Sequence, residues 1–272
     1  MTPVLGDDDI LFVCDLAGEA GAMSIRLWEN VTVGHKSGPS DPVTSADIAI
    51  SELLVEKLKE RFPGDQIVSE EDKSHPETVE TERVWLIDPI DGTDSYIKNN
   101  GQYSVMIGLI ENGRPVFGFV YEPIPGRCYF GGPEYGAFRK VRDAEPEKLF
   151  VKQSLAHNDE TRLMMSHRDR RRHPWVEELQ TVNLYKTGSI GLKIARILED
   201  QADLFVHLSG KLKVWDTAGP AAIALAGGLE TGTLDCDELS FPLPSVLHRT
   251  EIIMGRKGSL SWCRKHLRAS NK

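Results

Sequence analysis

A hydrophobic strand runs directly into two carboxylates and a glycine turn at residues 84–93, which read V-W-L-I-D-P-I-D-G-T. Asp88 and Asp91 lie three residues apart, and the proline between them disfavours helical geometry at Asp88, so both side chains can converge on one point. Gly92 permits a ligand to approach the backbone closely, and Thr93 offers a hydroxyl and an amide where a helix can begin. Hard oxygen ligands of this kind select Mg²⁺ or Mn²⁺, which typically act on phosphate esters. The alternative is an ordinary acidic turn after a buried strand.

Three more acidic motifs stand at the edges of apolar segments, where secondary structure can hold a carboxylate in place. Each has a simpler interpretation as well. Glu70 could lie in a solvated acidic loop, Asp47 in the first turn of a helix capped by Thr44 or Ser45, and Asp216 could merely cap a helix rich in small residues. The motifs are Q-I-V-S-E-E-D (residues 66–72, with Glu70), D-P-V-T-S-A-D (41–47, with Asp47) and W-D-T-A-G-P (215–220, with Asp216).

The composition is typical of a soluble globular chain, with 272 residues of which 40% are hydrophobic and 27% charged. A net charge of −9 argues against nucleic acid or an anionic membrane as a partner. The sequence shows no basic leader and no apolar run that approaches a membrane span, which predicts a cytoplasmic location. Its cysteines are widely spaced and are expected to be reduced thiols: Cys14, Cys128, Cys236 and Cys263.

The apolar periodicity predicts two N-terminal helices. The first is expected over residues 8–29. The second follows residue 47 and is expected to place one set of residues on or near a single apolar stripe: Ile48, Leu54, Leu58 and Phe62.

The rest of the chain predicts a hairpin followed by alternating helices and strands. Residues 104–110 and 115–121 read as strands around the turn E-N-G-R. A polar, charge-rich stretch at 140–148 then marks the expected boundary between two subdomains, 1–145 and 146–272. Beyond it we expect strands at 162–166, 183–186, 204–207 and 251–255, and helices at 189–199 and 217–225.

In order and approximate spacing, four blocks of the chain resemble those of the Mg²⁺-dependent, lithium-sensitive phosphatases of the inositol monophosphatase superfamily. They are D-P-V-T-S-A-D (41–47), S-E-E (69–71), D-P-I-D-G-T (88–93) and W-D-T-A (215–218). The resemblance covers nearly the whole chain and implies an α+β fold, a layered α-β-α-β-α sandwich of the inositol monophosphatase/fructose-1,6-bisphosphatase type. The active site would lie between the subdomains, with most metal ligands in residues 1–145 and Asp216 and the substrate-selecting residues in 146–272.

The same resemblance implies roles for individual residues around two or three Mg²⁺ ions, with Mn²⁺ as a possible substitute. The metal ligands would be Glu70, Asp88, Asp91, Asp216 and the carbonyl of Ile90. The catalytic residues would be Glu70 with Thr93 and Asp47, which orient the attacking water, and the phosphate would rest against Asp91, Gly92 and Thr93. The chemistry agrees, because cations neutralise the phosphate oxygens, lower the pKa of water and stabilise the leaving alkoxide.

Two stretches favour the 3'(2'),5'-bisphosphate nucleotidase branch of this superfamily. Residues 95–105 look like that branch's F-I-K-R-x-G-x-[FY]-[ST]-V, and residues 188–193 resemble its G-S-S-x-K if one extra residue is allowed. Gly188 and Ser189 would then bind phosphate or sugar, and Lys193 would meet a second phosphate or an adenine. The alternative for the lysine is a snorkelling surface side chain.

A basic cluster at residues 165–173 is open to two interpretations, a solvated loop or a phosphate-binding surface that steers a doubly charged substrate. Within it, Ser166 and His167 look like the branch's nucleotide-contacting turn. The chain departs from the branch at His207, where an arginine is common, and a histidine near pH 7 could replace that arginine only partly.

The sequence therefore predicts a Mg²⁺-dependent phosphomonoesterase, a 3'(2'),5'-bisphosphate nucleotidase acting on adenosine 3',5'-bisphosphate. Its partner would be a small phosphorylated substrate, with no nucleic acid or membrane, and it would be a monomer or a homodimer. The alternatives are an inositol monophosphatase or a sugar phosphatase like fructose-1,6-bisphosphatase, and a non-catalytic metabolite-binding regulator. The regulator would have no chemical need for every metal carboxylate.

Overall fold

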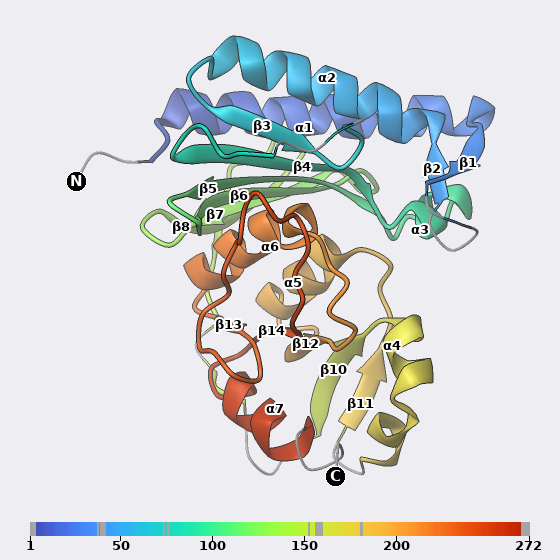
Figure 1. The fold of residues 1–272 in the computed structure, drawn as a ribbon, viewed down its shortest axis with the longest axis vertical. Coiled ribbons are helices and arrows are strands. Elements are labelled where there is room, and N and C mark those ends of the chain that lie inside the picture. Colours follow the sequence, from blue (N-terminus) through green and yellow to red (C-terminus); the bar gives the residue numbers. More distant parts are fainter. Residues whose placement is uncertain are drawn as a thin grey trace.

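The computed structural model of the protein describes residues 4–36, 38, 42–72, 74, 77–151, 153–155, 160–179 and 182–267. Helix and sheet layers alternate along the longest axis, with a seven-stranded sheet near one end and a five-stranded sheet near the other (Figure 1). This is the layered α+β arrangement that the resemblance implies. Asp41 lies outside the described residues, and no helix in the described part is long and apolar enough to cross a membrane.

The seven-stranded sheet runs in the order β3-β4-β5-β6-β7-β8-β9 and is covered on its outer face by two long helices (Figure 1). Only the β3–β4 pair is parallel. The helices are α1 (Asp7–Leu27) and α2 (Ser45–Arg61), and the strands are β3 (Gln66–Ser69), β4 (Arg83–Asp91), β5 (Ser104–Glu111), β6 (Arg114–Glu122), β7 (Arg127–Gly132), β8 (Gly136–Val141) and β9 (Glu147–Leu149).

Both faces of strand β4 are buried, which explains its continuous apolar sequence. Trp85 and Ile87 pack with α1 and α2, whereas Val84 and Leu86 face the helices between the two sheets. This alternation fixes the register, since a slip by one residue would exchange the two cores. Strand β4 therefore delivers its carboxyl end to a defined place.

The helices between the sheets are α5 (Ile190–Leu198) and α6 (Val214–Ala226). Helix α6 packs directly on the backbone of the hairpin, because a Cβ atom at Gly118 would lie 2.2 Å from the carbonyl oxygen of Gly219 and one at Gly108 would lie 2.4 Å from its amide nitrogen. The contact needs glycine on both sides and sets the depth at which α6, with Asp216 in its first turn, meets the sheet.

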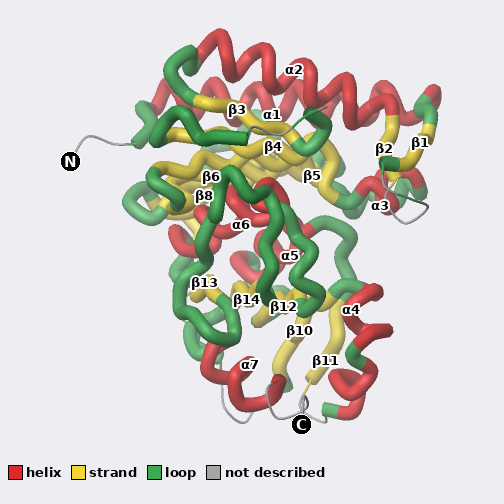
Figure 2. The backbone as a smooth tube through the Cα atoms, in the orientation of Figure 1, coloured by secondary structure: helices red, strands yellow, loops and turns green. Residues whose placement is uncertain are grey.

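The five-stranded sheet has the order β11-β10-β12-β14-β13, in which β10 is parallel to both β11 and β12. Helix α7 and the α4–η2 segment lie toward the far end of the molecule (Figure 1), and α7 packs Leu260, Cys263 and Leu267 on this sheet. The irregular residues 233–251 run beside the middle layer (Figure 2). The elements are β10 (Thr161–Met165), α4 (His167–Arg172), η2 (Pro174–Glu178), β11 (Val182–Tyr185), β12 (Leu204–His207), β13 (Glu230–Gly232), β14 (Ile252–Gly255) and α7 (Ser259–Leu267).

The structure confirms the expected hairpin, whose turn places both Asn112 and Gly113 at positive φ. The predicted apolar stripe of α2 was partly wrong: Ile48 is 49% exposed, and the stripe is formed by Ile50 with Leu54 and Leu58. Ile48 lies two residues, or about 200°, from Ile50 around the helix and so points to solvent. The seven-stranded sheet ends with β9 at Leu149, beyond residue 145, and the division into two subdomains stays a prediction.

Candidate active site

Parallel strands β3 and β4 bring two carboxylates to the same edge of the sheet. Ser69 is paired with Ile87, and the Glu70 amide donates to the Ile87 carbonyl oxygen at 3.0 Å, so Glu70 lies beside Asp88. After Asp88 the pairing with β5 shifts its register, and the chain then turns through Gly92 at φ 96°. A side chain there would be strained, which explains the glycine.

Asp216 in the first turn of α6 completes a cluster of three carboxylates. One oxygen each from Glu70, Asp88 and Asp216 lies within 4.8 Å of the others. Asp88 is 2% exposed, and its Oδ1 atom has no hydrogen-bond partner among the described residues. Burial, followed by the charges of Glu70 and its neighbours, raises the pKa of Asp88 and of Asp216 well above the usual range. Without a counter-ion, these carboxylates repel one another.

Asp47 serves a structural role and also faces the turn. Its Oδ2 accepts hydrogen bonds from the Thr44 amide at 2.8 Å and the Thr44 hydroxyl at 2.5 Å, which forms the predicted cap of α2. Its Oδ1 lies 3.5 Å from the Thr93 hydroxyl, which is also 3.2 Å from the Ile90 carbonyl oxygen. Burial raises the pKa of Asp47 to about 6. The structure thus brings together the two residues predicted to orient water.

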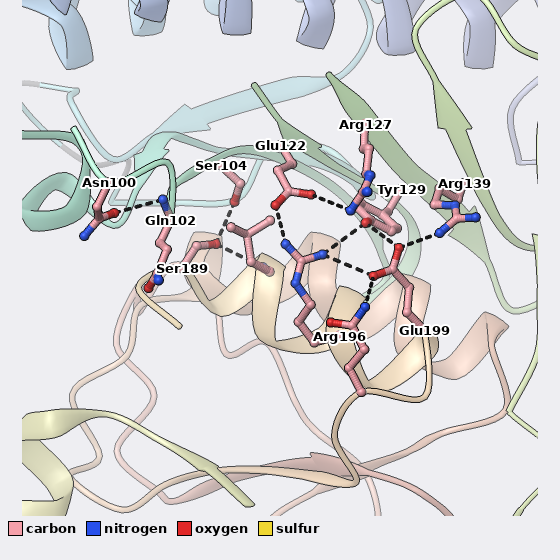
Figure 3. Close-up of polar contacts among 12 residues, drawn as sticks. Asn100, Gln102, Ser104, Glu122, Arg127, Tyr129, Arg139, Ser189, Arg196 and Glu199 are labelled. Atoms are coloured by element: carbon pink, nitrogen blue, oxygen red, sulfur yellow. Dashed lines mark hydrogen bonds and ion pairs between the residues drawn. The ribbon is translucent and has the colours of Figure 1, made fainter. Parts of the chain in front are cut away.

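Asp91 points toward α5 and is held by that helix. Its Oδ2 accepts from the Ser189 hydroxyl at 2.5 Å and from the Gly191 amide at 3.0 Å. Ser189 also caps α5 through the Leu192 amide and contacts the Ser104 hydroxyl at 2.7 Å (Figure 3). Burial raises the pKa of Asp91, although Lys193 and the hydrogen bond from Ser189 oppose this shift. The carboxylate therefore differs from Asp88 in having partners.

The other end of α5 is tied to the sheet by a network of charges (Figure 3). Arg196 donates to Glu122 on β6 and to Glu199 at 3.2 Å, and Arg139 on β8 donates to Glu199 at 2.7 Å. The hydroxyl of Tyr129 donates to Glu199 at 2.8 Å. Because both ends of α5 are anchored, Ser189 and its neighbours have a fixed position against Asp91.

A cleft of about 840 Å³ opens beside these groups. Lys193 lines it and is only 3% exposed, with Nζ donating to the carbonyl oxygens of Gly188 at 3.3 Å and Ser189 at 3.2 Å. Burial lowers the pKa of Lys193 to about 8, although the charges of Asp91 and Asp169 oppose the shift. The lysine is therefore not a snorkelling surface residue. A Cβ at Gly188 would lie 2.2 Å from the Ser95 hydroxyl, so the glycine permits this close packing.

The remaining predicted substrate contacts reach the cleft and also hold α4 in place. Ser166, His167 and His207 all line the cleft. The Ser166 hydroxyl accepts from the Asp169 amide at 3.0 Å and donates to the Asp169 carboxylate at 2.9 Å. His207 Nδ1 lies 2.9 Å from the same carboxylate, and its Nε2 lies 2.6 Å from the Ser209 hydroxyl. Both ring nitrogens of His207 therefore have protein partners.

Comparison with known proteins assigns the chain to a family. A model of the inositol monophosphatase family matches residues 8–268. The chain belongs to the inositol monophosphatase family.

Related members are known by sequence and by structure. The 3'(2'),5'-bisphosphate nucleotidase CysQ of Salmonella typhimurium is 35% identical over 229 residues, which covers 79% of this chain and 87% of the relative. CysQ of Aggregatibacter actinomycetemcomitans is 28% identical over 96% of this chain and 97% of its own length. Among solved structures, the IMPase of Thermotoga maritima has a TM-score of 0.80 at 21% identity, covering 97% of this chain and 98% of its own. CysQ of Bacteroides thetaiotaomicron has a TM-score of 0.73 at 25% identity, covering 92% and 97%.

Proteins of the inositol monophosphatase family are phosphatases and are generally metal-dependent, and the residues of this member suit a divalent cation. The buried, unpartnered Asp88 oxygen and the carboxylates converging on it are hard oxygen donors with uncompensated charge. An ion at this position would remove the repulsion that raises the pKa values of the cluster.

One feature of this family member was not predicted from the sequence. Lys36 donates to Glu70 at 2.9 Å and to Glu71 at 2.6 Å. Burial alone would lower the pKa of Lys36, but these two carboxylates outweigh it and raise the pKa. Lys36 precedes α2 in the chain and reaches Glu70 only through the tertiary fold, so no local motif marks it.

Proposed function

We propose that this phosphatase is a Mg²⁺-dependent phosphomonoesterase that hydrolyses the 3'-phosphate of adenosine 3',5'-bisphosphate to give AMP and phosphate. The observation that carries the proposal is the cluster of Glu70, Asp88 and Asp216, which stands at the wall of a cleft that Lys193 also lines. The choice of substrate is supported by the relatives named 3'(2'),5'-bisphosphate nucleotidase, which are 28–35% identical to this chain.

The ligands of the cation would be the clustered carboxylates, joined by Asp91 and by the Ile90 carbonyl, all of which line the cleft. Divalent ions bound there would supply charge neutralisation of the phosphate and its leaving oxygen and would make water acidic enough to attack. Asp91 keeps its Oδ2 atom on Ser189 and Gly191, so only its other oxygen is available to such an ion.

The residues of the turn would orient the reactants. The Thr93 hydroxyl can accept a hydrogen bond from the attacking water while it donates to Asp47, which places the water at a defined angle to the phosphate. The phosphate would lie against the backbone at Gly92 and Thr93, where the first amides of α3 (Thr93–Ile97) are not paired within the helix. Lys193 would contact the remainder of the substrate.

The experiment is a set of initial rates of phosphate release from adenosine 3',5'-bisphosphate, inositol 1-phosphate and fructose 1,6-bisphosphate, each with Mg²⁺ and with EDTA. A Mg²⁺-dependent preference for the nucleotide in kcat/KM is the expected result. The variant Asp88→Asn, purified in parallel, reports any contaminating phosphatase. Equal or faster release from a sugar phosphate would reject the nucleotide assignment, and release that survives EDTA would reject the metal.

One observation favours a second candidate, an inositol or sugar phosphatase. His207 stands where the nucleotidase branch commonly has an arginine, and both of its ring nitrogens contact protein groups. Without that arginine, β12 offers less positive charge to a second phosphate group of the substrate. The substrate comparison above decides between the two candidates, because inositol 1-phosphate carries a single phosphate.

A further inference from the structure

Helix α4 presents two arginines to the cleft that bind no protein group among the described residues. Arg171 and Arg172 are exposed and line the cleft, and in the described part of the chain neither has a hydrogen bond or an ion pair. Arg170 on the same helix behaves differently, because it does not line the cleft and is bound to Glu177 at 2.6 Å. Helix α4 thus uses one arginine for its own packing and turns the next two toward the cavity.

The position of α4 is fixed by buried polar contacts. Asp169 has no exposed side-chain surface and bonds both the Ser166 hydroxyl and His207 on β12. The His173 amide donates to the Asp169 carbonyl oxygen at 2.8 Å and ends the helix. A helix held at its first turn by β12 keeps the arginines of its last turn at a constant distance from the cleft floor.

The other lysine and arginine side chains around the cleft, Arg168 included, already have protein partners. Lys193 donates to two backbone carbonyl oxygens, and Lys36 is paired with Glu70 and Glu71. His207 is held by Asp169. A second anionic group on a ligand would therefore find its guanidinium partners on α4, and guanidinium groups bind phosphate in a bidentate way.

We propose that Arg171 and Arg172 form the subsite for the second phosphate of the substrate. The inference rests on the proposed function, and it defines the substrate class as compounds with two phosphate groups, one at the carboxylate cluster and one at α4. In this chain α4 would thereby supply the positive charge that β12 lacks at His207. Two arginines at the rim would also attract a multiply charged anion to a protein of net charge −9.

The test is calorimetric binding of AMP, which carries only the second phosphate, to the full-length protein in EDTA. Chelation leaves the phosphate no metal ion to bind, so the arginines are its expected partners. The double variant Arg171→Ala/Arg172→Ala should bind AMP roughly 30-fold more weakly than the wild type, since each charge-assisted contact contributes severalfold. The variant Arg170→Ala, which removes one positive charge from the same helix but none from the cleft, should bind AMP within about twofold of the wild type.

Adenosine, which has no phosphate, is the control ligand for AMP. If the double variant weakens adenosine and AMP equally, or if Arg170→Ala weakens AMP as much as the double variant does, the arginines do not form a phosphate subsite. Failure of the wild type to bind AMP, or full affinity in the double variant, also overturns the proposal. An unchanged Tm of the double variant shows that a weaker affinity is not caused by misfolding.

The proposed function has a separate readout. Wild-type rates on adenosine 3',5'-bisphosphate and inositol 1-phosphate decide the reaction, whereas AMP binding in EDTA decides the subsite. A protein that prefers inositol 1-phosphate and yet loses AMP affinity in the double variant would retain the α4 subsite without the nucleotidase activity. As a further check, the preference for the bisphosphate over adenosine 3'-monophosphate should fall in the double variant and decline with added salt in the wild type.

Discussion

Two buried aspartates of this protein have opposite surroundings. Asp88, 2% exposed, faces other carboxylates, and its Oδ1 atom has no partner in the described part of the chain. Asp203, 7% exposed, directly precedes β12 and accepts hydrogen bonds from Arg162 at 2.7 Å and Arg256 at 2.8 Å. Burial raises the pKa of Asp88 together with neighbouring charges, whereas the bonds from Arg162 outweigh burial and lower the pKa of Asp203.

The difference shows that the effect of burying a carboxylate depends on whether the chain supplies its counter-ions. The arginines around Asp203 belong to the chain, so the charge of this group is balanced when the protein folds. Lys36 pairs with Glu70, but Asp88 Oδ1 has no partner among the described residues, and under the proposed function a cation from solution would supply the remaining charge. The ion pairs of Asp203 stabilise the fold, whereas the carboxylates around Asp88 repel one another until a bound cation relieves the repulsion.

The largest effect should come from Asp88→Asn. Losing one ligand of the cluster should lower kcat by on the order of a thousandfold, because the charge that holds the cation is reduced. The free energy of unfolding in EDTA should stay equal or rise, since the substitution removes a repulsive charge. Steady-state rates in Mg²⁺ and urea unfolding in EDTA measure the two quantities.

Asp94→Asn is the matched control for that substitution, because Asp94 is exposed and follows Thr93 directly. Its kcat should remain within about threefold of the wild type. Normal turnover in a folded Asp88→Asn protein would remove the distinction between the two aspartates.

The second-largest effect should come from Asp203→Asn, which should lower stability without changing turnover, the reverse of Asp88→Asn. Asp203→Asn should leave kcat per folded molecule unchanged but destabilise the protein by about 2–3 kcal/mol, because the buried guanidinium of Arg256 loses its charge partner. Asp200 also contacts Arg162 and Arg256 and keeps the loss below that of an isolated pair. Thermal unfolding measures the effect, with Tm lower by roughly 5–10 °C. An unchanged Tm would show that the arginines are solvated in solution.

Much of the sheet edge that carries Asp88 and Asp91, the proposed metal site, was predictable because its signals are local. The strand, the glycine turn and the start of a helix stand within residues 84–93, and the structure contains them as β4, Gly92 at positive φ and α3. The proximity of Asp216 to Asp88 is not local. It depends on the glycine contact between α6 and the hairpin, and only the family resemblance indicated it.

Other parts were beyond local patterns for the same reason. Lys36 reaches Glu70 across the fold, and nothing near it in sequence indicates the pair. Strands β7 and β8 were also not predicted, although each forms a hairpin with the strand directly before it in the chain. Helix α7 was not predicted because its buried side chains belong to a cluster with residues distant in the chain, such as Leu163. The contact of His207 with Asp169 is likewise set by the position of α4, so the sequence could show the missing arginine but not this partner of the histidine.

The third effect is a dependence of stability on pH that Mg²⁺ should abolish. In the metal-free protein, burial raises the pKa of Asp47 from 3.8 to about 6 and that of Glu71 from 4.5 to about 7. Because both values are raised, their contribution to stability is present below the unfolded-state pKa and is lost as the pH rises through 6 to 7.

Thermal unfolding at several pH values, in EDTA and in excess Mg²⁺, measures this effect. In EDTA the Tm should fall by roughly 5 °C between about pH 5 and about pH 8, and added Mg²⁺ should restore more of it at the higher pH. Asp203 should act in the opposite direction only under strongly acidic conditions, since its pKa is lowered, and His248, whose pKa burial lowers from 6.5 to about 4, should do so only up to about pH 6.5. A Tm in EDTA that climbs between about pH 6.5 and about pH 8 would contradict the unbalanced charge of the cluster.

The smallest effect should come from Ser189, because Asp91 lies between the two extremes. Asp91 is buried among carboxylates, yet it has a hydroxyl and an amide as partners. Ser189→Ala removes the hydroxyl and the cap of α5, which should cost about 1 kcal/mol of stability and raise the Mg²⁺ concentration for half-maximal rate by about threefold, since the freed carboxylate is held less firmly. Ser24→Ala removes an equally buried hydroxyl on α1 and should cost stability without changing the Mg²⁺ requirement. If both variants keep the wild-type Mg²⁺ requirement, the contact of Ser189 with Asp91 is structural, and Asp91 belongs with Asp203 rather than with Asp88.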